Sequence, residues 1–157
     1  MTYGIPATVG PLWPRLASAS VTKLLLSIHV LAAIVAIGPV TVAASMFPAA
    51  ARRGDVATMR TLHRICRVYA ALGVVVPVFG LATATSLGVL TDAWLLVSIA
   101  LTLAAAGLLG LLLLPGQARV LGGAPDPRLS MLTGIFNLLW ATVVVLMIVR
   151  PGSTTGA

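Results

Sequence analysis

The amino-acid sequence predicts an all-α polytopic membrane protein, a bundle of four transmembrane helices. Of its 157 residues, 59% are hydrophobic and 8% are charged, whereas about a quarter of the residues in a soluble domain are charged. The apolar residues also fall into four runs with almost no charge, each long enough to cross a hydrocarbon core about 30 Å thick. We therefore expect a single membrane domain, 1–157, in contact with the lipid bilayer.

The four runs give the expected helix boundaries. Transmembrane helices are predicted at about 23–47, 67–90, 94–114 and 129–149, with a basic cytoplasmic loop at 48–66. The first apolar run is longer than the 7–15 residues of a signal peptide. We therefore expect the first helix to be retained.

Two aspartates are expected to begin helices. The connection Thr91–Ala93 is so short that the second and third helices are predicted to be antiparallel neighbours. Asp92 is expected to be the N-cap of the third helix and to accept backbone N–H groups. Gly54 and Asp55 likewise form a stop and a cap, so the second helix is able to begin in the cytoplasm near Val56.

The basic residues predict the orientation. Seven arginines follow the first and third helices: Arg52, Arg53, Arg60, Arg64, Arg67, Arg119 and Arg128. Three basic residues lie on the other side: Arg15, Lys23 and Arg150. By the positive-inside rule both termini lie outside the cytoplasm. The same rule accounts for the net charge of +7 without nucleic-acid binding. The abundance of arginine and alanine is typical of a high-GC bacterium, so we expect a bacterial plasma membrane.

Arg60, Arg64 and Arg67 lie at positions i, i+4 and i+7, which share one face of a helix. One interpretation is a solvated anchor of the positive-inside kind. The other is a contact for anionic lipid headgroups or an acidic partner.

Small residues predict where the helices pack, because close van der Waals contact holds helices together in lipid. Gly80, Ala84 and Gly88 form a stripe at a spacing of four on the second helix. The other three helices carry shorter sets of this kind: Ala32 and Ala36, Ala106 and Gly110, Gly134 and Ala141.

Pro39 and Pro77 are expected to kink the first and second helices, because proline lacks the N–H that would bond to the carbonyl four residues earlier. Asn137 lies at a similar depth, roughly 12 Å from the start of the fourth helix. An amide in hydrocarbon needs a partner. We expect Asn137 to donate to a carbonyl freed by a kink, that of Gly73 above all, or to face the helix of a partner protein.

The sequence contains few side chains that could take part in catalysis or ion transport. No charged residue lies in the middle of a span, where pumps and ion-coupled transporters place them. The three acids, Asp55, Asp92 and Asp126, lie in loops or caps, so no acid–base pair is expected. We predict no enzyme, no cofactor and no small-molecule substrate.

Two histidines leave alternatives open. His29 lies inside the first span, where it could bind haem or copper, with Met147 as a second ligand, or hydrogen-bond a neighbouring helix. His63, Cys66 and Met59 near the start of the second helix suit Cu(I), but their spacing matches no metal motif and favours a structural role.

The segment SIHVLAAIVAIGPVTVAASMFP, residues 27–48, resembles the opening helix of a family of small bacterial four-helix membrane proteins of unknown function. His29, Gly38 and Phe47 match that helix, and Pro39 departs from it. Members of such families are similar to accessory subunits beside actinobacterial respiratory oxidases. The resemblance therefore implies a supporting role in a respiratory assembly.

The predicted function is a non-catalytic accessory or assembly subunit that binds other integral membrane subunits. One alternative is a haem- or copper-handling membrane protein that uses His29. The other is a passive channel or small-solute transporter with a cavity lined at Pro39 and Pro77.

Overall fold

The computed structural model describes residues 12–152, with side chains from residue 19 onward, and every regular element in this part is helical. The elements are α1 (Leu12–Arg52), α2 (Val56–Leu72), α3 (Val75–Leu87), α4 (Ala93–Gly107), the π-helix η1 (Leu108–Leu113), α5 (Leu114–Leu121) and α6 (Leu129–Val149). They form four rods, each long and apolar enough to cross a membrane. The prediction of an all-α protein with four transmembrane helices is confirmed.

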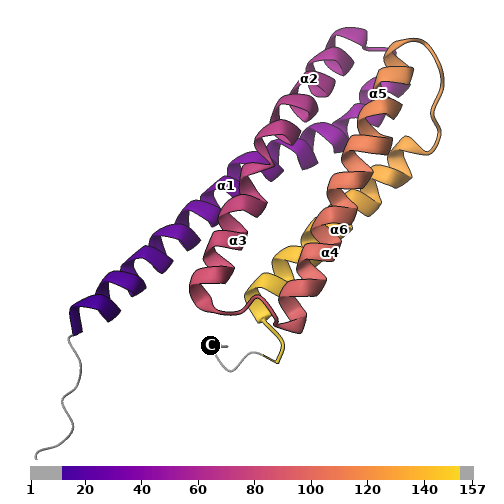
Figure 1. Ribbon diagram of the computed structural model, residues 1–157. Coiled ribbons are helices and arrows are strands. Elements are labelled where there is room, and N and C mark those ends of the chain that lie inside the picture. Colours follow the sequence, from indigo (N-terminus) through magenta and orange to yellow (C-terminus); the bar gives the residue numbers. More distant parts are fainter. Residues whose placement is uncertain (1–11, 153–157) are drawn as a thin grey trace, which may run out of the picture.

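The rods pair as two helical hairpins (Figure 1). In the first, α1 packs along both α2 and α3; in the second, α4 packs along α6. The hairpins meet where α1 contacts α6 and where α2 contacts α5. Although α3 and α4 are consecutive and antiparallel, each has its main contacts with a different helix, and the two pack together near the turn that joins them.

The predicted loop at 48–66 is wrong, because most of it is helical. α1 continues through Pro48 to Arg52, and α2 begins at Val56. Pro48 lacks one backbone hydrogen bond, but Phe47 and Ala50 are fully buried on either side of it, and this packing holds the turn. α1 also begins at Leu12 rather than near residue 23, whereas α6 has the predicted bounds.

The turn between α1 and α2 follows the predicted chemistry. Gly54 has φ +67°, a conformation that glycine adopts readily. Asp55 is the N-cap of α2, where its carboxylate accepts the backbone N–H of Thr58 at 3.0 Å and the hydroxyl of Thr58 at 2.6 Å. The hydrogen bond from the Thr58 hydroxyl is the main reason that the pKa of Asp55 lies below its ordinary value, and the bond from the backbone N–H acts in the same direction.

Pro77 and Pro39 have different effects on the helices that contain them. The second rod is interrupted at Gly73, four residues before Pro77, where the N–H of Val76 bonds to the Gly73 carbonyl at 3.1 Å. That carbonyl is therefore already satisfied. Pro39 lies within α1 and does not end it.

The third rod extends beyond its predicted end near residue 114. It runs through η1 and past Pro115 to Leu121. At its start Asp92 occupies the N-cap position, but its carboxylate makes no bond to the helix backbone. It accepts the indole N–H of Trp94 at 2.9 Å instead, which corrects the predicted capping bond.

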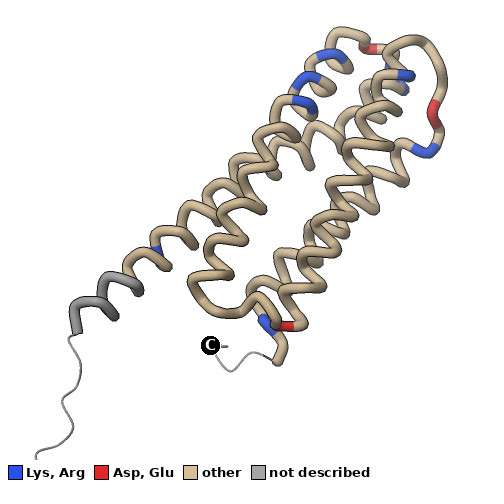
Figure 2. Tube along the Cα trace, in the orientation of Figure 1, with Lys and Arg blue, Asp and Glu red and all other residues tan. Residues whose placement is uncertain are grey.

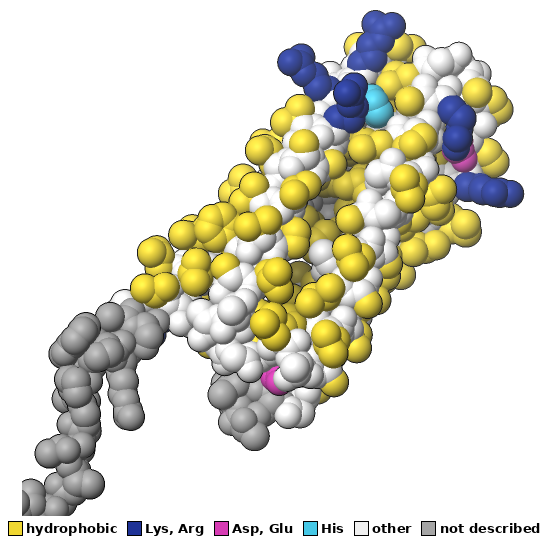
Figure 3. Space-filling model, in the orientation of Figure 1, with side chains coloured by type: hydrophobic (Ala, Val, Ile, Leu, Met, Phe, Trp, Pro, Cys, Tyr) yellow, Lys and Arg dark blue, Asp and Glu magenta, His cyan; other side chains and the backbone are white. Residues whose placement is uncertain are grey.

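The charges divide the molecule into two ends. Figure 2 shows arginines gathered around the α1–α2 turn and the α5–α6 connection, which we call the arginine end. At the opposite end of the bundle, Asp92 and Arg150 both contact Trp94. Arg15, counted in the prediction of topology, has a side chain outside the described residues. Between the ends the surface is mainly hydrophobic (Figure 3).

The main core lies toward the arginine end. It includes buried residues from all four rods, among them Phe47, Leu62, Leu113 and Phe136. A second cluster, near the opposite end, is smaller and contains Ala84, Trp94 and Leu95.

Candidate functional site

A polar contact joins α2 to α5 near the arginine end. The side chain of Gln117 on α5 is fully buried and reaches between two residues of α2. Its Oε1 lies 3.0 Å from His63 Nδ1, and its Nε2 donates to Cys66 Sγ at 3.7 Å. Because Nε2 donates to sulfur, Oε1 is the acceptor, and His63 therefore carries a proton on Nδ1.

This contact involves two members of the predicted group, His63 and Cys66, but not Met59. Met59 and Cys66 are buried in the core, while His63 is half-buried beside them. Within the described residues no three His, Cys, Asp or Glu side chains are grouped closely enough to hold a metal ion. His63 and Cys66 of α2, together with Gln117 of α5, therefore link the two hairpins, and we call this contact the seam.

His63 also borders a shallow surface hollow. The hollow is lined by His63, Arg64, Arg67, Val68 and Ala71, all from α2. Figure 3 shows basic side chains gathered around a histidine at this end of the molecule. Arg60, one turn further from the bundle centre, is exposed. The three arginines of the predicted basic face therefore lie outside the core, and two of them line this hollow.

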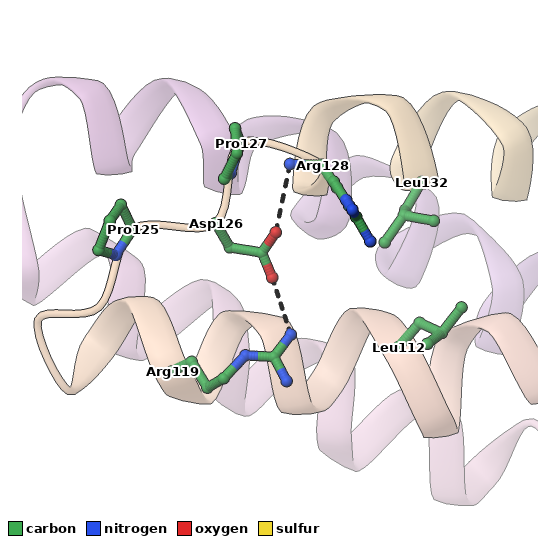
Figure 4. Close-up of a pocket in the computed structure, with 7 residues that line it drawn as sticks. All are labelled: Leu112, Arg119, Pro125, Asp126, Pro127, Arg128 and Leu132. Carbon is green, nitrogen blue, oxygen red and sulfur yellow. Dashed lines mark hydrogen bonds and ion pairs between the residues drawn. The ribbon is translucent and has the colours of Figure 1, made fainter.

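A second hollow lies at the α5–α6 connection (Figure 4). Asp126 lies between two partners there: Arg119 donates to its Oδ2 at 2.9 Å, and the backbone N–H of Arg128 donates to its Oδ1 at 3.2 Å. The hydrogen bond from Arg119 is the main reason that the pKa of Asp126 is below its ordinary value. Figure 4 shows the Arg128 side chain extending toward Leu132 rather than toward the carboxylate.

His29 lies between α1 and α3. Its Nδ1 is 2.9 Å from the carbonyl oxygen of Val76, so Nδ1–H donates to that carbonyl. The imidazole lies directly on Gly80, where a Cβ would come within 2.8 Å of the ring. Met147, the second ligand considered, packs instead against the cluster of Ala84, Trp94 and Leu95.

The small-residue stripe of the second rod is shorter than predicted. Gly80 provides room for the His29 ring, and Ala84 is buried. Gly88, the third member, does not pack, because it ends α3 with φ +69° and a Cβ there would meet nothing within 4 Å. Ala106 and Gly110 on the third rod are exposed.

Asn137 has a different partner from the one predicted. Its Nδ2 donates to Ser45 Oγ on α1 at 2.9 Å, not to the Gly73 carbonyl. The reason is the arrangement of the helices: α6 packs on α4 and α1, and Gly73 ends α2 and is bonded locally. Two buried atoms one turn apart on α6, Asn137 Oδ1 and Trp140 Nε1, make no hydrogen bond within the part of the chain that the structure describes.

Sequence reasoning missed Gln117. It is the only glutamine in the chain and lies in a segment predicted to be a loop after the third helix. It is one of only two side-chain amides in the chain, the other being Asn137, and this rarity is the signal that could have found it. Comparison of the chain with protein-family models, with curated proteins and with solved structures found no match.

Proposed function

We propose that this chain is a non-catalytic accessory or assembly subunit of a larger complex in the bacterial plasma membrane. The observation that supports the proposal is a face of small residues on the third rod that the chain itself does not use. Ala106 and Gly110 are exposed four residues apart, and a Cβ on Gly110 would meet nothing within 4 Å.

Small residues at this spacing let a second helix approach closely within a bilayer. The face also includes the start of η1, and π-helical segments are frequent at functional sites. The occupant we infer is a transmembrane helix of another subunit. The resemblance of residues 27–48 favours a respiratory oxidase as the complex. The distribution of basic residues favours termini outside the cytoplasm.

Purification of the tagged chain in a mild detergent tests the proposal. We expect a native-gel species much larger than 16.1 kDa that contains integral subunits of an oxidase. Ala106→Leu/Gly110→Leu should release the chain from it. Ala82→Leu, on an exposed position of α3, is the control and should leave the complex intact. An unassociated wild-type chain, or equal effects of the two variants, would contradict the proposal.

A second candidate is a haem- or copper-handling protein. It rests on His29, whose Nδ1 is held by the Val76 carbonyl while Nε2 has no hydrogen-bond partner among the described residues. Metal-binding histidines are commonly oriented by such a bond from the other ring nitrogen. A Soret band or bound copper that disappears in His29→Ala, in protein that remains folded, would support it; a colourless, copper-free wild type would not.

A further inference from the structure

The exposed face of α2 changes from cationic to apolar within about one turn. Two neighbouring rows of side chains run along it at a spacing of four residues: Arg60, Arg64, Val68 and Leu72 in one row, and His63, Arg67 and Ala71 in the other. In both rows the last polar group is followed directly by an apolar side chain. Val68 and Leu72 are each 49% exposed.

The change lies at the level expected for a membrane boundary. Arg67 precedes the last residue of α3, Leu87, by 20 positions, which is about 30 Å of helix and matches a hydrocarbon core. The α2 residues before Arg67 then project into the headgroup region, and those after it face acyl chains.

The cationic groups here are available to a ligand. Within the described residues the only ion pair joins Arg119 to Asp126, so Arg64 and Arg67 have no acidic partner. Gln117 fixes the His63 ring through Nδ1, and Nε2 is left without a hydrogen bond among the described residues. His63, Arg64 and Arg67 line one hollow together with Val68 and Ala71.

We propose that this hollow binds the phosphate of an anionic phospholipid, held by Arg64, Arg67 and the Nε2–H of the doubly protonated His63 ring, with its acyl chain along Val68 and Leu72. The site lies on α2 and is independent of the α4–η1 face discussed above. Arginine is well suited to the headgroup because its planar guanidinium donates two parallel hydrogen bonds to phosphate. The apolar continuation of both rows favours a lipid over a free phosphate ion.

Native mass spectrometry of the purified full chain in neutral detergent tests the proposal. We expect phosphatidylglycerol to bind at least about tenfold more tightly than phosphatidylcholine, since each basic residue adds to the attraction of an anionic lipid. Arg64→Gln/Arg67→Gln should abolish this preference. Arg52→Gln/Arg53→Gln removes the same charge from exposed positions at the same end and should retain it.

The ¹⁵N signals of His63 give a second measurement that needs no variant. Phosphatidylglycerol should shift the Nε2 signal far more than the Nδ1 signal. The proposal is overturned if both double variants lose the preference equally, if Nε2 does not respond, or if millimolar inorganic phosphate displaces the lipid and produces the same Nε2 shift, which would indicate a soluble-anion site.

Discussion

The two ends of this protein are built differently. At the arginine end, residues from all four rods close a core around Phe47, Leu62 and Leu113, and Gln117 links α2 to α5. At the opposite end the core is a small cluster around Trp94 and Leu95. Two polar contacts converge on Trp94 there: Asp92 accepts its indole N–H, and the Arg150 guanidinium lies 5.6 Å from the centre of its ring.

The difference follows from the solvent that each region meets. Near the arginine end α2 and α5 are amphipathic, with buried Met59, Leu62 and Cys66 on one face of α2 and arginines on the other. This pattern is typical of a helix that packs by the hydrophobic effect in water. In hydrocarbon that driving force is missing, and the rods there are apolar all round.

The first prediction compares the same substitution at each end. Leu113→Ala should lower the free energy of unfolding by about 4 kcal/mol, because Leu113 is fully buried in the large core. Leu95→Ala should lower it by about 2 kcal/mol, since its cluster is small and able to collapse around the change. Unfolding in mixed micelles measures both. Equal losses would show that the two ends are equally well packed.

The second prediction compares two fully buried polar residues. Gln117→Leu should cost about 1–3 kcal/mol, because it leaves the Nδ1–H of His63 without its acceptor. Ser98→Ala should cost less than about 1 kcal/mol, because Ser98 donates only to its own helix, at the Trp94 carbonyl. If the serine variant proved the less stable of the two, Gln117 would not be the link between the hairpins.

The third prediction concerns Asn137, at membrane depth between the two ends. Asn137→Leu should change the stability by less than about 1 kcal/mol, because interhelical hydrogen bonds in membranes are weak on average. The substitution also removes the Oδ1 atom that has no partner. Thermal unfolding of Asn137→Leu beside Ser45→Ala measures this. A loss of several kcal/mol in both would mean that their hydrogen bond is a main support of the bundle.

The fourth prediction is a pH dependence that belongs to the arginine end. Asp55 and Asp126 have pKa values below those of the unfolded chain. Their contribution to stability is therefore present above about pH 4 and is lost as the pH falls through the folded-state pKa values. We expect a small fall in Tm as the pH is lowered below about 4. Asp55→Asn/Asp126→Asn should flatten that fall, and an unchanged profile would assign the acid sensitivity to another region.

The sequence was a good guide where the membrane alone decides the structure. Long apolar runs leave no alternative to spanning helices, so the fold class and the bounds of the fourth helix were predictable. The cap at Asp55 was also predictable, because its chemistry is local.

The sequence was a poor guide where distant packing decides. The segment 48–66 lies between two apolar runs and was predicted to be a loop, but burial of Phe47 and Ala50 keeps Pro48 helical. The partners of Asn137 and Gln117 depend on which rods meet, and helix spacing within one rod does not reveal this.

The π-helix in the third rod has a consequence for the seam at Gln117. A π-helical turn accommodates one more residue than an α-helical turn, and each residue turns an α-helix by about 100°. Deleting one leucine from η1 would therefore leave an ordinary α-helical turn, with α5 in nearly the same rotational phase relative to α4. The wide turn absorbs one extra residue of the rod, so we expect a single-codon deletion there to leave the contact between Gln117 and His63 in place.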